Sequence, residues 1–373
     1  MKNKNILIFC ISLNRGGAER VVSLLLKEFT SLNNVNIHLV MLEDAITYEL
    51  PKAITPVILS RGHNNGVYKF LELPLVAYKL AQYIKVQKIE TVLSFLYRPN
   101  YINIVAKLFG AKHKAVINIR STTSRYLNEG LLGKINLFLI KSLFNKSDLI
   151  ISNSLGVDED LKKIMDIRTQ TKVINNPLDL DFIEKEKLIC RDIKFKFDKN
   201  IRYVISLGRL IPLKRNKDLI DAFYELQKQD ETIKLIFLGY GSMREELQSY
   251  CKSLNILNKV DFLGDVTNPF YYLAKSDLFV LNSQTEGFPN VLIEAMASGI
   301  PVISSDCKSG PREILKGGKY GYLYPVGDIK LLIEKMKKVL YSNLDITRVK
   351  NMNKERVFDF RVEKIMKKFT EVL

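Results

Sequence analysis

Apolar runs of strand length alternate with helix-period segments along almost the whole 373-residue chain. The first two runs, NILIFCIS (5–12) and NIHLVML (36–42), are separated by AERVVSLLLKEF (18–29), whose apolar residues recur every three or four positions. Parallel strands need crossover helices, which cover both faces of the sheet. The alternation therefore predicts an α/β fold with doubly wound parallel sheets.

One polar and charged stretch of weak periodicity, residues 172–200, interrupts this alternation before it restarts at RYVISLG (202–208). A chain of this length is long for a single hydrophobic core. We therefore expect two Rossmann-like domains, over 1–177 and 178–354, joined near 178–200. Ligands bind at the carboxyl ends of such strands, and two sheets facing one another would form a central cleft.

Basic residues are unevenly distributed along the sequence. The formal net charge is +17, and residues 61–147 hold fourteen Lys and Arg against three Glu, so +11 of the excess falls there. A localised basic region predicts a polyanionic partner, either a nucleic acid or an anionic membrane surface. A nucleic-acid-binding protein is thus the non-enzyme alternative, but no nucleic-acid motif accompanies the charge, and we expect no nucleic-acid partner.

The cysteines and the N-terminus indicate the compartment. Four cysteines lie far apart without a CxxC pair, which argues against a disulfide framework or a zinc knuckle and fits a reducing cytoplasm. MKNKNILIFC (1–10) shows no small-residue cleavage site, and no window approaches the roughly 20 apolar residues of a membrane span. We therefore expect a protein that is neither secreted nor membrane-spanning.

Two adjacent glycines, Gly16 and Gly17, follow the first predicted strand and precede a helix. At such a turn, backbone N–H groups and the helix N-terminus can closely approach a phosphate or a sugar. The stretch NRGGAE (14–19) is not the GxGxxG of dinucleotide-binding enzymes, which disfavours an oxidoreductase.

The second predicted domain carries two cations in one loop. SLGRLIPLKRNKDLI (206–220) follows the domain's first strand and contains Arg209 and Lys214. Two such cations can hold a diphosphate.

Two carboxylates follow further along, in SQTEGFPNVLIEAMASGIPVI (283–303). Glu286 ends a strand, and Glu294 lies eight positions later in an otherwise apolar helix, where an unpaired carboxylate would be costly. The N–H groups near Asn290 and Val291 would point at anionic oxygens, and the carboxylates could accept hydrogen bonds from sugar hydroxyls. This constellation suits a nucleotide diphosphate that carries a sugar at each end.

A family resemblance rests on these motifs together. They occur in the order Gly16-Gly17, GRL (208–210) with Lys214, LGYGSMREEL (238–247), and Glu286 with Glu294. The set resembles the large retaining GT-B glycosyltransferase family 4 over nearly the whole chain. Shorter segments, among them GGAERVV (16–22), RPNYI (98–102) and SGPRE (309–313), resemble bacterial N-acetylgalactosaminyltransferases that extend undecaprenyl-diphosphate-linked glycans.

The resemblance implies a role for each site residue. Arg209 and Lys214 would hold the donor diphosphate, Glu286 would contact the donor sugar, and these three are the expected catalytic residues. The donor-binding set would comprise Gly16, Gly17, Arg209, Lys214, Asn290, Val291 and Glu294, with Glu294 on the ribose. Arg120 stands where many family members have a histidine near the acceptor. The first domain would bind the acceptor, and a C-terminal helix over about 355–373 would pack back onto it.

The implied function is retaining transfer of a hexosamine, N-acetylgalactosamine, from a UDP-sugar to a lipid-linked glycan of bacterial surface polysaccharide or glycoprotein assembly. Transfer of another UDP-hexose in capsule or O-antigen synthesis is the alternative. We expect no cofactor and no metal. DLD (179–181) matches the DxD metal motif, but it lies in the interdomain connection, and a match of three residues often arises by chance.

The segment LLGKINLFLIKSLFNKS (131–147) predicts a helix with a broad apolar surface. Packing on the sheet would account for most of that surface. Its lysines, Lys134, Lys141 and Lys146, could also hold anionic lipid headgroups. The expected location is therefore the cytoplasm, at the inner face of the plasma membrane.

Overall fold

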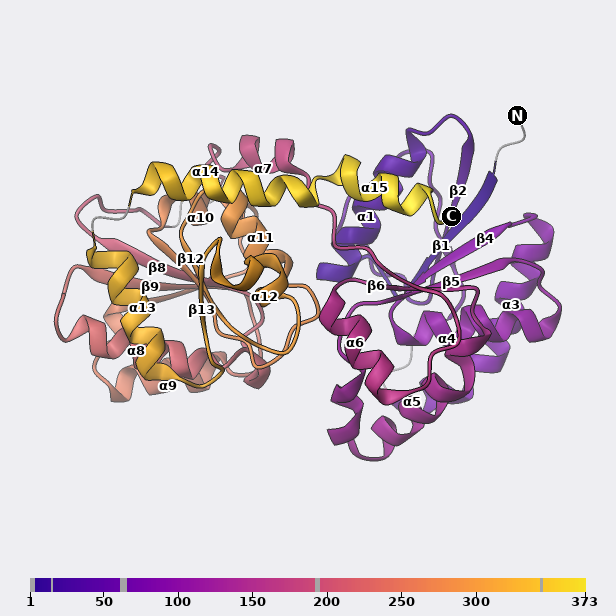
Figure 1. The fold of residues 1–373 in the computed structure, drawn as a ribbon, viewed down its shortest axis with the longest axis horizontal. Coiled ribbons are helices and arrows are strands. Elements are labelled where there is room, and N and C mark those ends of the chain that lie inside the picture. The colour runs from indigo at the N-terminus through magenta and orange to yellow at the C-terminus, as the bar shows by residue number, and fades with distance from the viewer. Residues whose placement is uncertain (1–3, 15, 61–65, 192–194, 343–344) are drawn as a thin grey trace. The chain divides into compact units, whose positions relative to one another are not determined.

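The computed structural model describes residues 4–14, 16–60, 66–191, 195–342 and 345–373. The chain divides into two compact units, Met1–Pro177 with Val362–Leu373, and Leu178–Arg361 (Figure 1). Each unit is a parallel sheet covered by helices on both faces, so the α/β class predicted from the sequence is confirmed. In the described part of the chain, no helix is both long and apolar enough to cross a bilayer.

The sheet of the first unit has seven strands among the described residues, in the order β3-β2-β1-β4-β5-β6-β7. All of their pairings are parallel. The strands are β1 Lys4–Cys10, β2 Val35–Met41, β3 Val57–Ile58, β4 Thr91–Phe95, β5 Lys114–Ile119, β6 Leu149–Ser152 and β7 Thr171–Val173.

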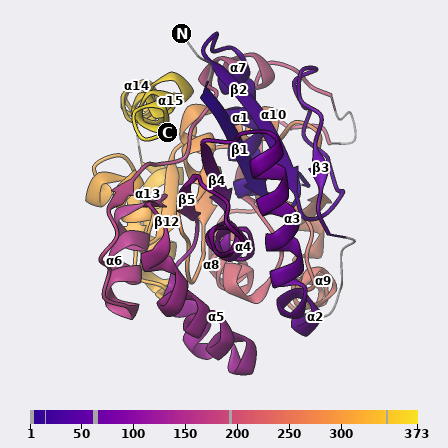
Figure 2. The same ribbon diagram turned by 90° about the vertical axis from the view of Figure 1, so that its right-hand side faces the viewer.

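Helices cover both faces of this sheet (Figure 2), and a hydrophobic core lies on each face. Helices α1 and α15 pack on one face, and α3, α4, α5 and α6 contribute to the core on the other. The helices are α1 Gly17–Thr30, α2 Gly66–Leu71, α3 Leu73–Val86, α4 Tyr97–Ala106, α5 Gly130–Leu143, α6 Leu155–Ile164 and α15 Val362–Thr370, with 3₁₀ turns η1 Lys107–Phe109, η2 Thr123–Asn128 and η3 Phe144–Lys146.

The C-terminal segment completes the first unit. Ile365 and Phe369 of α15 are fully buried in the core that α1 covers. Lys114 Nζ donates a hydrogen bond to the carbonyl of Val372 at 2.6 Å, and Thr91 Oγ1 donates one to the carbonyl of Leu373 at 3.4 Å. The return to the first unit at Val362 is later than the predicted position near 355, because residues 355–361 still belong to the second unit.

The second unit repeats the architecture with six strands among its described residues, in the order β10-β9-β8-β11-β12-β13. Its strands are β8 Arg202–Leu207, β9 Ile233–Leu238, β10 Val260–Gly264, β11 Leu278–Leu281, β12 Val302–Ser305 and β13 Tyr322–Tyr324. Its helices are α7 Leu180–Glu186, α8 Asn216–Gln227, α9 Arg244–Ser253, α10 Pro269–Lys275, α11 Asn290–Ala297, α12 Pro311–Ile314, α13 Ile329–Tyr341 and α14 Ile346–Val357, with 3₁₀ turns η4 Pro212–Lys214, η5 Leu257–Lys259, η6 Lys316–Gly318 and η7 Phe358–Phe360.

Each sheet reverses its strand order at one point, between β1 and β4 in the first unit and between β8 and β11 in the second. In open α/β sheets, ligands bind outside the carboxyl ends of the two strands that flank such a switch point. The loops after β1, β8 and β11 carry the glycine pair, the two cations and Glu286, respectively.

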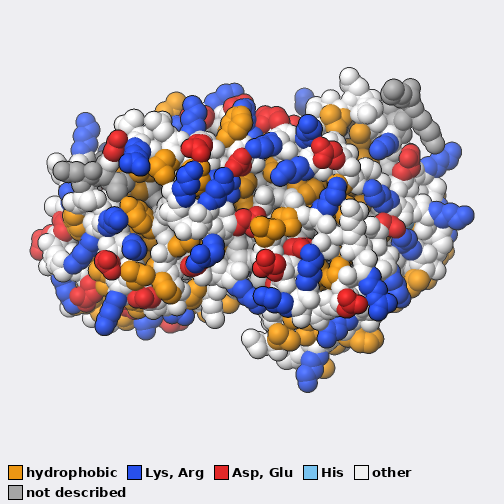
Figure 3. Space-filling model, viewed as in Figure 1, with side chains coloured by type: hydrophobic (Ala, Val, Ile, Leu, Met, Phe, Trp, Pro, Cys, Tyr) orange, Lys and Arg blue, Asp and Glu red, His pale blue; other side chains and the backbone are white. Residues whose placement is uncertain are grey.

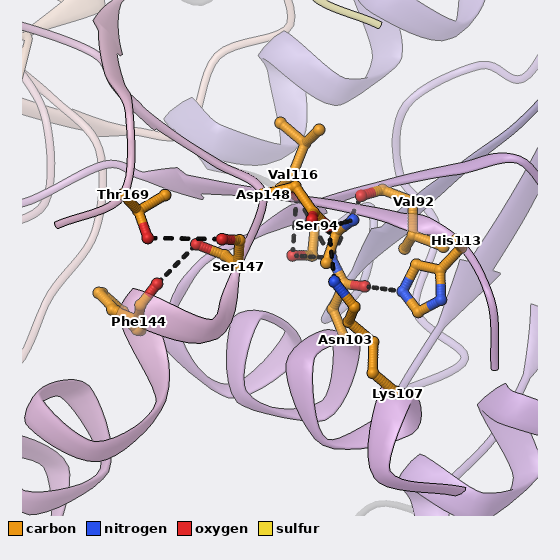
Figure 4. A network of polar contacts seen from close by, with 11 residues as sticks. Val92, Ser94, Asn103, Lys107, His113, Val116, Phe144, Ser147, Asp148 and Thr169 are labelled. Carbon is orange, nitrogen blue, oxygen red and sulfur yellow. Dashed lines mark hydrogen bonds and ion pairs between the residues drawn. The ribbon is translucent and has the colours of Figure 1, made fainter. Parts of the chain in front are cut away.

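A buried polar network joins β4, α4 and the turn before β5 (Figure 4). The ring nitrogen Nε2 of His113 lies 2.8 Å from Asn103 Oδ1, and Asn103 Nδ2 donates to Ser94 Oγ at 3.0 Å. Burial, with a smaller contribution from the charge of Lys107, lowers the pKa of His113 to about 4. His113 is therefore a neutral structural residue that donates its Nε2 proton to Asn103.

This histidine should make folding stability depend on pH. An unfolded histidine titrates near pH 6.5, so between pH 6.5 and 4 the unfolded chain binds more protons than the folded chain. The free energy of unfolding should consequently fall by about 3 kcal/mol from this group as the pH drops through that window. His113→Gln keeps an amide donor and should flatten this part of the profile in urea unfolding at pH 7 and 4.5; parallel profiles would contradict the assignment.

Candidate active site

Arg209 and Lys214 line one small pocket at the carboxyl end of β8. Arg209 follows the strand after Gly208, and Lys214 ends the 3₁₀ turn η4 just before α8. The pocket is lined by Ser206, Leu207, Gly208, Arg209, Leu210, Lys214, Asn216, Phe237, Leu281 and Asn282. The local fold thus places two cations around a single polar recess.

Lys214 forms an ion pair with Glu286 across the switch point. Its Nζ lies 2.5 Å from Glu286 Oε1, and Ser283 Oγ donates to the same oxygen at 2.6 Å. The Lys214 and Glu286 side chains are 20% and 14% exposed, so the pair is only partly screened by water. The carboxylate holds the ammonium group in place and leaves its remaining N–H donors for an anion.

Asn282, directly after β11, and Tyr324 of β13 fix the loop that carries Lys214. The next residue, Arg215, has a left-handed backbone with φ 46°, and its carbonyl accepts a 2.5 Å hydrogen bond from Asn282 Nδ2. The Tyr324 hydroxyl in turn bonds to Asn282 Oδ1. This chain of contacts holds an otherwise unfavourable turn in the conformation that presents Lys214.

Two glycines of the predicted LGYGS motif allow the loop after β9 to lie against the Arg209 loop. A Cβ atom at Gly239 would lie 2.3 Å from the carbonyl oxygen of Gly208, and one at Gly241 would lie 2.1 Å from that of Leu210. Both contacts are with backbone atoms, which cannot move aside as a flexible side chain can. Packing alone therefore requires glycine at both positions.

Helix α11 carries the second carboxylate. It begins at Asn290 after Pro289, and both Asn290 and Val291 remain partly exposed. Glu294, one turn further along, is only 3% exposed. The helix N-terminus therefore presents a positive dipole end beside Glu286, whereas Glu294 lies deeper in the unit.

A neighbouring loop supports this region. Ser309 Oγ donates a hydrogen bond to the carbonyl of Glu286. Burial, and secondarily the negative charge of Glu286, raises the pKa of Cys307 to about 12. Cys307 therefore remains a neutral thiol and is not a nucleophile at this site.

In the first unit, the glycine pair forms the start of α1. Gly16 is the N-cap residue and Gly17 is the first helical residue. The carboxylate of Glu19 folds back over Gly16, with Oε2 only 2.1 Å from where a Cβ atom would lie. Arg120, directly after β5, is 8% exposed and buried at the same edge of the sheet.

The three lysines predicted to meet a membrane are all exposed, two on α5 and one in the following turn. Two aspartates of the DLD stretch make contacts at α7. Asp179 caps α7 by accepting a 2.9 Å hydrogen bond from the Phe182 N–H, and Asp181 lies 3.8 Å from the Arg361 guanidinium.

Sequence reasoning missed Ser283, Asn282 and Tyr324. The first two lie three and four positions before the predicted Glu286, so their polar side chains directly after an apolar strand were a usable signal. Tyr324 lies 42 positions from Asn282, and an aromatic residue in a short strand carries no sign of that contact.

The fold is that of a two-unit α/β protein whose loops after β8 and β11 bring Arg209, Lys214 and Glu286 to one edge of the second sheet. Sequence profiles of two families match most of the chain: the family described as Glycosyltransferase Family 4 matches residues 15–182, and Glycosyl transferases group 1 matches residues 191–356.

Curated relatives extend the match over nearly the whole chain. The chain is 37% identical over 361 residues, 94% of this chain and 96% of the relative, to the N-acetylgalactosamine-N,N'-diacetylbacillosaminyl-diphospho-undecaprenol 4-alpha-N-acetylgalactosaminyltransferase of Campylobacter jejuni. A second C. jejuni protein, named an alpha-1,4-N-acetyl-D-galactosaminyltransferase acting on a diNAcBac-PP-undecaprenol glycan, is 28% identical over 97% of this chain and 96% of its own.

Solved structures share the fold. Anabaena HepE in complex with UDP and glucose superposes with a TM-score of 0.81 at 19% identity and 99% coverage of both chains. The lipopolysaccharide outer core galactosyltransferase WaaB gives a TM-score of 0.73 at 23% identity and 98% coverage of both. The chain belongs to the group 1 and family 4 glycosyltransferases, and the GT-B fold expected from the sequence is confirmed.

Proposed function

We propose that this glycosyltransferase moves N-acetylgalactosamine from UDP to a lipid-linked glycan, with retention of anomeric configuration and without a metal ion. The observation that carries the proposal is the 37% identity, over 94% of the chain, to an enzyme named for this sugar and for an undecaprenyl diphosphate acceptor. The residues that would act are Arg209, Lys214, Glu286 and Glu294.

In the proposed reaction, Arg209 and Lys214 bind the donor diphosphate beside the α11 N-terminus. Glu286, already bonded through Oε1 to Lys214 and Ser283, accepts hydrogen bonds from donor-sugar hydroxyls. Glu294 accepts hydrogen bonds from the ribose. These groups orient the donor and stabilise charge that grows on the leaving UDP.

Retention is proposed through front-face attack. The acceptor hydroxyl forms its bond to the anomeric carbon on the face from which the bond to the diphosphate oxygen breaks. The hydroxyl proton passes to the departing diphosphate, so no covalent enzyme intermediate is required. Glu286 supports this route because its Oε1 already accepts two hydrogen bonds, which reduces its nucleophilicity.

A panel of UDP-sugars tests the donor and the stereochemistry. The wild-type protein is incubated with UDP-linked N-acetylgalactosamine, N-acetylglucosamine, galactose or glucose and a synthetic polyprenyl diphosphate glycan. We expect stabilisation and transfer chiefly with the first donor, and an α-linked product by NMR. Preference for galactose or glucose would favour the alternative hexosyltransferase, and a β-linked product would overturn retention.

The same assay tests metal independence. Arg209 and Lys214 supply the positive charge that a divalent cation would otherwise place on the diphosphate. Turnover should therefore be unchanged in EDTA, whereas abolition by EDTA and rescue by Mn²⁺ would contradict the proposed role of the two cations.

The lipid-linked acceptor requires contact with a membrane, and α5 offers a protein surface for that contact. Ile140 and Leu143 pack into the core, but Leu131 and Phe138 are 71% and 68% exposed. Figure 3 shows hydrophobic and basic side chains together at the end of the first unit where α5 lies. Exposed apolar residues interspersed with lysines suit an anionic interface.

Binding to anionic vesicles should depend on the positive charge of these lysines. We expect the protein to bind phosphatidylglycerol-containing vesicles, to ignore neutral ones, and to be released by salt. Replacing Lys134, Lys141 and Lys146 by Glu should reduce vesicle binding and transfer to a long-chain acceptor, with little effect on a short soluble analogue.

The matched control makes the same charge change in the second unit. Lys252, Lys330 and Lys354 are exposed, and their replacement by Glu should leave vesicle binding nearly intact. Equal losses in both triple variants, or equal losses on both acceptors, would show that α5 is not the membrane contact.

A further inference from the structure

Three buried polar side chains lie together at the carboxyl edge of β5 and β6. Asn118, Arg120 and Asn153 are 0%, 8% and 2% exposed. Asn118 and Arg120 are two positions apart and so face the same side of the sheet, about 6.6 Å apart along it. The register pairs Ile119 with Ser152, which brings Asn153 beside Arg120, and Asn153 Nδ2 donates to the Arg120 carbonyl at 3.2 Å.

Much of the hydrogen-bonding capacity of this cluster is unmet. Within the described part of the chain, Arg120 Nε and Nη1, both amide atoms of Asn118, and Asn153 Oδ1 have no hydrogen-bond partner. Buried polar atoms are usually paired, and each one left without a partner costs about 1–3 kcal/mol. Five such atoms on three neighbouring residues indicate a site that a polar ligand completes.

The cluster is also positively charged. Burial lowers the pKa of Arg120 to about 10 and the charge of Glu19 opposes this shift, so the guanidinium remains a cation at neutral pH. Among the described residues, no carboxylate forms an ion pair with it within 4 Å. The guanidinium lies over the Phe95 ring, whose centroid is 5.9 Å from the Arg120 Cζ atom.

The N-terminus of α1 reinforces this preference for negative charge. Glu19, whose charge acts on Arg120, lies in the first turn of this 14-residue helix, and its carboxylate folds back over Gly16. The positive end of the helix dipole and the buried guanidinium therefore act on the same edge of the sheet. Glu19 provides only partial internal compensation.

We propose that Arg120, with Asn118 and Asn153, forms a subsite for phosphoryl oxygens of a substrate. The planar guanidinium offers paired donors to phosphate, and the Asn118 amide offers two more. The subsite rests on the proposed function, which supplies two sources of this chemistry. One is the diphosphate of UDP, and the other is the diphosphate of the lipid-linked acceptor.

Calorimetry with two probes identifies the source. UDP represents the donor, and farnesyl diphosphate, which carries no sugar and no nucleotide, represents the lipid diphosphate. Arg120→Gln should lower the affinity for one of the two probes at least tenfold. The probe whose affinity falls identifies which diphosphate, that of the donor or that of the acceptor, occupies the subsite. Arg120→Lys keeps the charge without the paired donors and should lie between Arg120→Gln and wild type.

Two further variants separate ligand binding from a structural role. Glu19→Gln removes the competing carboxylate and should tighten the same probe at least twofold, whereas a guanidinium needed only for folding would show no gain. Asn118→Asp is nearly isosteric and gives Arg120 an internal partner. It should raise the melting temperature of the first unit and weaken the same probe, and it decides the question if Arg120→Gln does not fold.

The two proposals fail in distinguishable ways. If wild-type protein transfers sugar while folded Arg120 and Asn118 variants bind both probes with wild-type affinity, the phosphoryl subsite is wrong and the proposed function stands. Weaker probe binding in Glu19→Gln would also overturn the subsite. If the wild-type protein binds neither UDP nor farnesyl diphosphate and transfers no sugar, both proposals are wrong.

Discussion

Lys214→Ala and Arg209→Ala should each lower kcat about 100- to 1,000-fold while weakening UDP binding much less. Both cations line the pocket after β8, where the charge on a departing diphosphate would be greatest at the transition state. Loss of one such donor typically costs roughly 2.7–4 kcal/mol of transition-state stabilisation. Steady-state kinetics with the UDP-sugar, together with calorimetry of UDP, separates the two effects.

Lys217→Ala is the matched control. Lys217 is exposed on α8, three positions from Lys214, and its ammonium lies 4.4 Å from the centroid of the Tyr250 ring. Its replacement should leave kcat within twofold of wild type. Near-normal turnover in folded Lys214→Ala and Arg209→Ala proteins would contradict the proposal that these two residues bind the donor diphosphate.

Glu294→Gln should weaken UDP about 10- to 100-fold, whereas Glu286→Gln should spare UDP and damage sugar transfer. Hydrogen bonds to a charged group contribute about 1.5–3 kcal/mol, which sets this range. The two carboxylates would meet opposite ends of the donor, the ribose and the transferred sugar. Calorimetry with UDP alone and transfer assays with the complete donor measure the two effects separately.

The ion pair between Lys214 and Glu286 sharpens this expectation. Glu286→Gln removes the carboxylate that lies 2.5 Å from the Lys214 ammonium, so UDP should bind that variant as tightly as wild type or more tightly. In the double variant Lys214→Ala/Glu286→Gln, the loss of transition-state stabilisation should be smaller than the sum of the losses in the two single variants, because the residues are in contact. Equal loss of UDP affinity in Glu286→Gln and Glu294→Gln would contradict the division.

The sequence was a good guide to strands, helices and strand ends because each leaves a local periodic signal. The alternation predicts both parallel sheets, and the loops after β8 and β11 follow directly from where the apolar runs stop. Brändén's rule then places Arg209, Lys214 and Glu286 at one edge. The position of these residues therefore needed no knowledge of tertiary contacts.

Contacts between distant residues could not be predicted in this way. The pairing of Lys214 with Glu286 spans 72 positions, and only the neighbouring placement of β8 and β11 brings them together. The burial of Arg120 was equally invisible, since an arginine after a strand usually faces solvent. The return to the first unit was predicted too early because α14 and the turn after it are as helix-like as α15.

The last twelve residues of the first unit affect how the protein is made. Val362–Leu373 supply part of the core that α1 covers, so the unit that begins the chain lacks that packing until residues 362–373 emerge from the ribosome. All of 178–361 must be synthesised in between, which takes on the order of 10 to 40 s at about 5–20 residues per second. During that interval the nascent first unit lacks the side chains that cover the apolar surface beside α1 in the folded chain.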